Sequence, residues 1–156
     1  MLQNFLNYDL IFGYFKYNHQ EFIMNDKVRI IINPTLDMVH GFHSNGINCG
    51  LDEKKLDLGI IFSKVPADTY AVFTTNRVLG AHIPVCKKHL ENNKAQMIVV
   101  NSKIANTCTG EEGIKNAETV CEKAAELFNI DASDVLPAST GVIGPQLPID
   151  KVLNGI

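Results

Sequence analysis

The chain has 156 residues, of which 46% are apolar and 20% charged, and its formal net charge is −3. This composition is typical of a globular protein rather than a disordered one, and the length suits one domain with a single core. Basic residues form no run longer than the pairs at 54–55 and 87–88, so the sequence does not indicate a nucleic-acid partner.

The N-terminal segment, residues 1–23, holds most of the aromatic side chains of the chain. It lacks the basic start and the cleavage site of a secretory signal, and no arginine precedes Arg29, which disfavours a mitochondrial presequence. No apolar run approaches the ~18 residues that span a bilayer. We therefore expect a cytoplasmic protein without a membrane partner.

The abrupt change in composition after this segment leaves two interpretations open. Residues 1–23 are either a non-native or disordered extension ahead of a true start at Met24, or a genuine extra strand or helix. No linker, repeat or low-complexity tract divides the remainder of the chain. Residues 24–156 are therefore predicted to belong to one domain.

Short β-branched runs bounded by turn residues fill the first part of this domain. Five strands are predicted, at residues 28–32, 58–62, 69–74, 82–86 and 97–100. A partly alternating stretch lies at 41–50, a turn is expected at 65–68, and the polar residues 87–94 are predicted to form a helical turn or short helix.

One helix stands out, at residues 110–129, where apolar side chains follow closely the i, i+3, i+4, i+7 spacing. Thr109 can cap this helix, and Glu111 and Glu112 complement the positive end of its dipole.

The chain then leads through residues 130–138 into a turn, and Pro148 suits the first position of another helix. That helix would be cut off at Ile156. The predicted architecture is α/β, with helices flanking a mixed sheet in a domain that is incomplete.

Three polar segments follow predicted strands, at residues 74–77, 101–110 and 139–141. Such residues often make only turns and caps, but loops at strand ends are also where α/β folds build their sites. In the third segment, Gly141 can bring a main-chain N–H close to a ligand, and the Thr140 hydroxyl is a second donor. Two donors aimed at one oxygen form an oxyanion hole, which stabilises charge in acyl transfer but cannot start the reaction.

No nucleophile with a partner base accompanies this turn in the sequence. There is no Gly-x-Ser-x-Gly, phosphate-loop or dinucleotide-binding motif, and no histidine stands in a recognisable pairing with a cysteine or serine. Cys108 is a candidate nucleophile because it directly precedes a predicted helix, whose dipole can lower a thiol pKa. The competing interpretation is that it is a buried structural thiol.

The cysteines form no C-x-x-C pair and are together predicted to be buried, reduced thiols, at Cys49, Cys86, Cys108 and Cys121. A metal site would have to combine His40, His43 and Cys49, whose spacing matches no familiar zinc pattern. We therefore predict neither a metal nor a resident cofactor.

Five short motifs occur in an order and spacing that match a known family. They are Val-Phe-Thr-Thr-Asn-Arg at 72–77, Val-Val-Asn-Ser at 99–102, Ala-Asn-Thr-Cys-Thr-Gly at 105–110, Ser-Thr-Gly-Val-Ile-Gly at 139–144 and Leu-Pro-Ile-Asp-Lys at 147–151. Together they closely resemble the N-terminal part of the ornithine acetyltransferases, also called glutamate N-acetyltransferases. The resemblance runs from about Gly41 to Ile156.

The resemblance implies a bifunctional enzyme of arginine biosynthesis that cuts itself before a threonine. That threonine then serves as nucleophile, and its freed amino group supplies the general base. An acetyl group would pass from N-acetylornithine, or from acetyl-CoA, to the threonine and on to glutamate. Thr140 and Gly141 match the pair that forms the oxyanion hole. The fold would be part of an αββα sandwich, and the cleaved C-terminal chain of the same enzyme would be the partner in a hetero-oligomer.

The sequence also departs from the family pattern. Lys103-Ile104 stands where the family usually has Gly-Asn, which puts the local geometry and substrate fit in question, and Gly41-Phe42-His43 replaces Gly-Phe-Arg. The Ala-Thr-Met-Leu-like motif of the cleavage threonine is absent from these 156 residues. The chain alone is therefore predicted to be an inactive fragment. The alternative function is a module that binds an amino acid or acyl ligand without chemistry.

Overall fold

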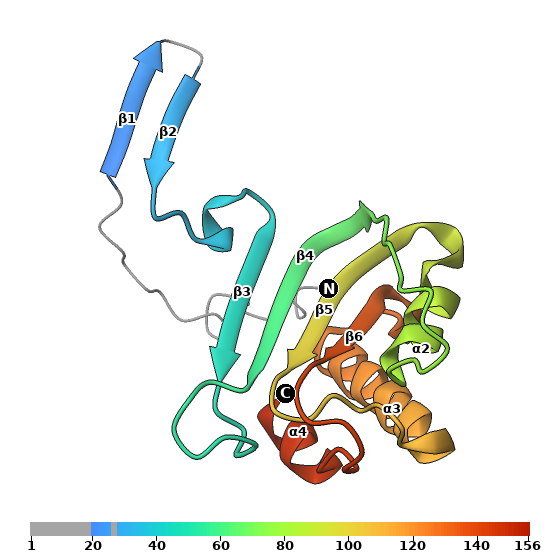
Figure 1. Ribbon diagram of the computed structural model, residues 1–156. Helices are drawn as coiled ribbons and strands as arrows, with labels where there is room; N and C mark the ends of the chain where they lie inside the picture. Colours follow the sequence, from blue (N-terminus) through green and yellow to red (C-terminus); the bar gives the residue numbers. More distant parts are fainter. Residues whose placement is uncertain (1–19, 26–27) are drawn as a thin grey trace, which may run out of the picture.

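The computed structural model describes residues 20–25 and 28–156 (Figure 1). Its main unit is a sheet in the order β3-β4-β5-β6. These strands are β3 (Phe42–Ile47), β4 (Leu58–Asp68), β5 (Lys94–Asn101) and β6 (Val135–Ser139). The sheet is mixed, because β3, β4 and β5 pair antiparallel while β6 runs parallel to β5.

A separate two-stranded sheet precedes this unit along the chain, made of β1 (Gln20–Asn25) and β2 (Val28–Ile32). The two strands pair antiparallel, and the predicted strand at 28–32 is confirmed. The expected extension at 1–23 lies outside the described residues except for the first part of β1, so its interpretation stays a prediction.

Helices pack on one face of the main sheet (Figure 1), namely α3 (Gly110–Phe128) and α4 (Ile149–Gly155). Alternate residues of β5 are buried beneath them, as the two-residue period of a strand requires. The core joins strand residues such as Phe62 and Val99 to one side of α3, where the rings of Phe62 and Phe128 lie 5.0 Å apart. The predicted mixed sheet with flanking helices is confirmed.

The outer edge of β6 is covered by a third helix, α2 (His82–His89). The Cys86 thiol donates to the carbonyl oxygen of Pro137 over 3.1 Å, and His89 Nδ1 lies 2.8 Å from that of Val135. Pro137 faces this edge, where its missing N–H removes no bond to β5. The helix therefore protects an edge that could otherwise pair with another chain.

The strand predicted at 82–86 is wrong, because these residues form most of α2. Short apolar runs do not distinguish a strand from a buried helix face, and here Val85 and Cys86 are buried while Pro84 lies in the first turn, where no N–H is needed. The helical turn predicted at 87–94 is confirmed in part, since α2 continues to His89 and a 3₁₀ turn covers Leu90–Asn92.

Two further predictions next to β4 are wrong. The turn expected at 65–68 is instead part of β4, which continues past Pro66 with an irregular register between Phe62 and Ala67. An irregularity of this kind accommodates a proline without ending the strand. The strand expected at 69–74 pairs with no strand in the described part of the chain, and Tyr70 is 83% exposed.

The helix predicted at 110–129 is confirmed as α3. Thr109 occupies its N-cap position, but the Thr109 hydroxyl donates to Asn106 Oδ1 over 2.8 Å instead of capping a helix N–H. The helix ends at Phe128, and the next residue, Asn129, has the left-handed backbone that often follows a helix. The last helix, α4, begins one residue after Pro148. Among the described residues, we find no helix with the length and apolar character needed to cross a bilayer.

Candidate active site

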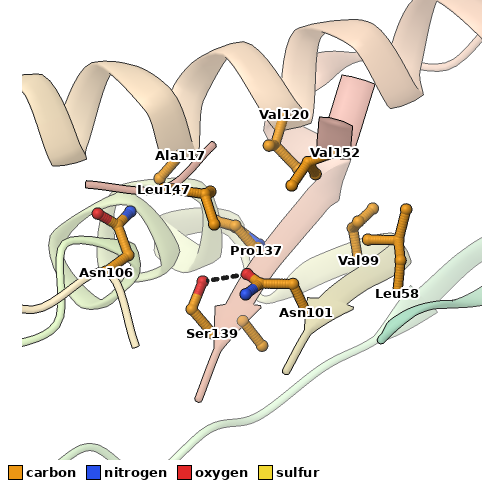
Figure 2. A pocket seen from close by; sticks show the side chains of 11 residues that line it. Leu58, Val99, Asn101, Asn106, Ala117, Val120, Pro137, Ser139, Leu147 and Val152 are labelled. Atoms are coloured by element: carbon orange, nitrogen blue, oxygen red, sulfur yellow. Dashed lines mark hydrogen bonds between the residues drawn. The ribbon is translucent and has the colours of Figure 1, made fainter. Parts of the chain in front are cut away.

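The carboxyl ends of β5 and β6 meet at one edge of the sheet because these strands run parallel. Asn101 and Ser139 are register partners there, and the Ser139 hydroxyl donates to Asn101 Oδ1 over 2.6 Å (Figure 2). The buried Asn101 amide donates to the carbonyl oxygens of Ser102 (3.1 Å) and Ile104 (2.9 Å). Asn101 therefore uses its oxygen and both amide hydrogens to hold the start of both loops.

A small cavity lies behind these residues, between the sheet and the helices (Figure 2). Its volume is about 10 Å³, and most of its lining is apolar, from Leu58 and Val99 on the sheet to Val120 and Val152 on the helices. This space is enough for about one water molecule. A cavity of this size is too small for a ligand as large as an amino acid.

The turn after β6 offers two hydrogen-bond donors on that outer side. The N–H of Thr140 donates to the carbonyl oxygen of Asn101 (3.0 Å), and the N–H of Val142 donates to that of Lys103 (2.8 Å). Between them, the Gly141 N–H and the Thr140 hydroxyl have no partner among the described residues, and both residues are exposed. The pair predicted from the sequence is thus accessible rather than sealed in the core.

Gly141 is required at its position by two features of the backbone. Its φ is 137°, a value that residues with a side chain rarely adopt. A Cβ at this position would also lie 2.0 Å from the carbonyl carbon of Lys103 and 2.5 Å from the nitrogen of Ile104. Such contacts force the main chain to move. The close approach of the two loops therefore depends on the absence of a side chain at 141.

The loop after β5 and the loop after β6 are joined along their length by main-chain hydrogen bonds. The N–H of Ala105 donates to the carbonyl oxygen of Val142 (2.9 Å), and that of Gly144 donates to Thr107 (3.0 Å). The Gln146 side chain adds a bond to the carbonyl oxygen of Thr109 (2.9 Å). Two of the three polar segments predicted to form a site are therefore brought together.

The third polar segment, at 74–77, reaches the other side of the same loop. An isolated bridge pairs Gly80 with Thr107, and Arg77 lines a hollow of about 510 Å³ together with Cys108 and Glu111, which we call the Arg77 hollow. The segment makes no contact with the turn at 139–141 that the structure records. The three polar segments therefore do not form a single site.

Two acidic residues that sequence reasoning missed support the loop after β5. Asp52 Oδ2 lies 2.6 Å from Lys103 Nζ, and this ion pair lowers the pKa of the Asp52 carboxyl and raises that of the Lys103 ammonium. Asp57 is buried, and its carbonyl oxygen accepts the N–H of Ser102 (2.8 Å). A short run rich in both acidic and basic residues, as at 52–57, is typical of a solvated loop, so the sequence carried no signal of this contact.

The cysteines are only partly as predicted. Cys86 and Cys121 are buried, and burial raises their thiol pKa values to about 11 and about 12. Cys49 is half-buried, whereas Cys108 is exposed, so the prediction of a buried Cys108 is wrong. Its backbone is left-handed (φ 61°) in a loop turned outward, which places the side chain at the Arg77 hollow. The described residues contain no cluster of metal-ligating side chains.

The family of the chain follows from comparison with known proteins. A model of the ArgJ family matches residues 43–156, which is well over half of the sequence. The chain belongs to the ArgJ family.

Curated relatives are named arginine biosynthesis bifunctional protein ArgJ. The ArgJ of Caldanaerobacter subterraneus is 44% identical over 126 residues, covering 81% of this chain and 31% of the relative. That of Thermotoga neapolitana is 48% identical over 118 residues, covering 74% and 30%. The chain thus spans about a third of the length of the curated relatives it matches.

Solved structures agree with this assignment. A crystal structure of ArgJ from Bacillus halodurans has a TM-score of 0.73 and 43% identity, covering 74% of this chain and 61% of that one. The ornithine acetyltransferase of Mycobacterium tuberculosis, solved in complex with ornithine, has a TM-score of 0.71 and 32% identity, covering 74% and 64%. The resemblance drawn from the sequence strings is confirmed, and so is the fold class.

The backbone at residue 103 explains why a glycine is expected there in the ArgJ family. Lys103 replaces an expected glycine, and its backbone has a φ of 76°, in the left-handed region that glycine adopts freely. The chain therefore keeps a glycine-like conformation at a lysine. The Gly-Phe-His variation falls at Gly41, Phe42 and His43, at the start of β3.

Proposed function

We propose that this chain supplies the oxyanion hole of an acetyl-transfer site, formed by the Gly141 N–H and the Thr140 hydroxyl. The observation that carries this proposal is an exposed turn in which the main-chain donors on both sides are engaged while these two are not. Donors held in place before the reaction stabilise a developing oxyanion without having to reorganise.

The reaction we propose belongs to the longer protein. An acetyl group passes from N-acetylornithine, or from acetyl-CoA, to a threonine nucleophile and then to glutamate, as a step of arginine biosynthesis in the cytoplasm. The threonine attacks the acetyl carbonyl carbon, the carbonyl oxygen becomes an oxyanion at the Thr140–Gly141 turn, and ornithine leaves with the proton taken from the threonine. The nucleophile, freed by self-cleavage, lies on polypeptide beyond these 156 residues. Membership of the ArgJ family supports this scheme.

The partner we propose is the C-terminal part of the same enzyme, in a hetero-oligomer of cleaved chains. The helices cover one face of the main sheet, while on β5 the side chains of Ile98 and Val100 on the opposite face are each 37% exposed. An apolar sheet face of this kind is normally buried in a layered α/β fold. A second sheet from the C-terminal part, packed on this face, would complete an αββα sandwich.

Thr140 offers the cleanest test, because its exposed side chain can be changed without disturbing the core. In the full-length enzyme, Thr140→Ala removes one donor and is expected to lower kcat about 100-fold for acetyl transfer from N-acetylornithine to glutamate. Thr140→Ser keeps a hydroxyl and is the matched control, which should retain most of the activity. An unchanged kcat in Thr140→Ala would contradict the role of the hydroxyl.

A second experiment tests whether acetyl transfer needs both this chain and the C-terminal part of the enzyme. Mixing this chain with a separately produced C-terminal part should restore acetyl transfer, whereas this chain alone should show none. Calorimetry on the chain alone distinguishes the alternative. Stoichiometric binding of an amino acid or acyl ligand without the C-terminal part would favour a non-catalytic binding module.

A further inference from the structure

Lys103 has a left-handed backbone, which is unfavourable for a residue with a side chain. Its main chain is also the surface against which the oxyanion turn packs. The Lys103 carbonyl oxygen accepts the N–H of Val142 (2.8 Å), and a Cβ on Gly141 would lie only 2.0 Å from the Lys103 carbonyl carbon. The placement of the peptide between residues 103 and 104 therefore governs the direction of the Gly141 N–H.

The side chain of Lys103 is anchored to the loop between β3 and β4. Its Nζ lies 2.6 Å from Asp52 Oδ2, and the Asp52 side chain is only 12% exposed. The other carboxylate oxygen accepts the main-chain N–H groups of Lys54 (2.8 Å) and Lys55 (2.9 Å). Asp52 is thus oriented by its own loop before it meets the lysine.

That loop is in turn fixed by Asp57, which is buried. The Asp57 carboxylate accepts the N–H groups of Cys49 and Asp52, each over 2.6 Å, and its carbonyl oxygen accepts the N–H of Ser102. The residue before Lys103 and the end of the Lys103 side chain are therefore held by the same rigid loop.

We propose that the ion pair between Lys103 and Asp52 is a positioning contact for the oxyanion hole. It holds residue 103 in its left-handed conformation, and the 103–104 peptide then fixes the Gly141 N–H where the oxyanion forms. This inference rests on the proposed oxyanion role of Gly141. Lys103 touches no reacting atom in this scheme and acts through its main chain.

The test compares substitutions of Lys103 in the full-length enzyme. Lys103→Met removes the ion pair but still places a residue with a side chain at a left-handed backbone position. It is expected to lower kcat about tenfold with little change in KM. Lys103→Gly also removes the ion pair, but glycine adopts this φ without help, so kcat should stay within about twofold of the wild type. Lys94→Met is the control, since it breaks an ion pair with Asp68 at the other end of β5.

Asp52→Asn gives an independent arm of the same experiment. It should lower kcat in the wild-type background and have no further effect in the Lys103→Gly background, because glycine no longer needs the contact. Equal kcat values for Lys103→Met and Lys103→Gly, whether both high or both low, would overturn the inference.

Hydrogen exchange separates this inference from the proposed function. Exchange of the peptide covering residues 139–144 should be faster in Lys103→Met than in Lys103→Gly, because the Val142 N–H bonds to the Lys103 carbonyl oxygen. If Thr140→Ala leaves kcat unchanged while this difference in exchange is seen, the role of the Thr140 hydroxyl fails, and Lys103 still positions the main chain at Gly141 and Val142. No difference in exchange overturns the positioning contact itself.

Discussion

The turn at 139–144 and the segment at 74–77 are similar in sequence, since each begins with a few small or polar residues after an apolar run, but they are held in different ways. The turn is joined by main-chain hydrogen bonds to the loop after the neighbouring parallel strand. The segment is held largely by its own residues, with the N–H of Asn76 on Thr74 Oγ1 (3.1 Å) and that of Val78 on Asn76 Oδ1 (3.0 Å). Similar turn-forming residues are therefore held by a neighbouring loop in the first region and mainly by one another in the second.

The two regions should therefore respond differently to mutation. In the turn, a change is transmitted to a partner loop and to the donors, because each main-chain bond there crosses between two segments. In the segment at 74–77, a change is absorbed locally, because the residues around it are exposed.

The largest effect is expected at Gly141. Gly141→Ala places a Cβ 2.0 Å from the Lys103 carbonyl carbon, so the two loops must separate and the donors must move. We expect kcat of the full-length enzyme to fall at least about 100-fold. Gly144→Ala is the matched control, because Gly144 also has a positive φ (109°) but a Cβ there meets nothing within 4 Å. A similar loss in both variants would show that backbone strain, and not the approach of Lys103, is what matters.

The next effect is on stability, at Asn101. Asn101→Ala leaves the half-buried Ser139 hydroxyl and the half-buried carbonyl oxygen of Ile104 without their hydrogen-bond partner. We expect the free energy of unfolding to fall by about 1–3 kcal/mol, measured by urea denaturation. Asn76→Ala, in the exposed segment, should cost less than about 0.5 kcal/mol. Equal costs would mean that the two regions are held alike, contrary to the comparison.

A smaller effect, dependent on pH, is expected at Asp52. The pKa of its carboxyl is lowered, first by the hydrogen bond with Lys103 and then by the N–H groups of Lys54 and Lys55. The folded state therefore binds this proton less readily than the unfolded state, so the contribution to stability is present above the ordinary pKa of 3.8 and is lost as the pH falls below it.

Asp52→Asn should accordingly destabilise the protein at pH 6 and have less effect at pH 3, as measured by the urea midpoint. Glu53→Gln removes a charge from the same loop and controls for net charge. An effect of Asp52→Asn that is the same at both pH values would show that the carboxylate charge does not stabilise the loop.

The sequence predicts those elements whose pattern is long or whose ends are marked. The helix α3 is recognisable because its 19 residues bury one face against the sheet, so the apolar spacing repeats several times. The runs at 69–74 and 82–86 are each too short to show a period, and tertiary contacts decide them. The first lacks a partner strand in the described region, and the second packs on the edge of β6 as α2.

The candidate site likewise contains residues that the sequence indicates and residues that it does not. Thr140 and Gly141 are found because small residues in a fixed string indicate a close main-chain approach, and their catalytic role stays a prediction. Asp52 is not found, because its contact with Lys103 joins two loops that are distant in sequence and composed of ordinary polar residues. Long-range ion pairs leave no local pattern, so the support of a site is harder to predict than the site itself.

The smallest effect is expected at Cys108, the residue that the sequence left open as a nucleophile. Its thiol is exposed at the Arg77 hollow, on the side of the loop away from the turn, whereas Cys86 and Cys121 are buried with raised pKa values. A mild electrophile should therefore label Cys108 before those two thiols, and Cys108→Ser should abolish that labelling while leaving kcat within about twofold, since a serine fills the same space. A loss of acetyl transfer in Cys108→Ser would instead indicate that the reaction takes place at the Arg77 hollow. The segment at 74–77 would then be part of the active site, contrary to its comparison with the turn at 139–144.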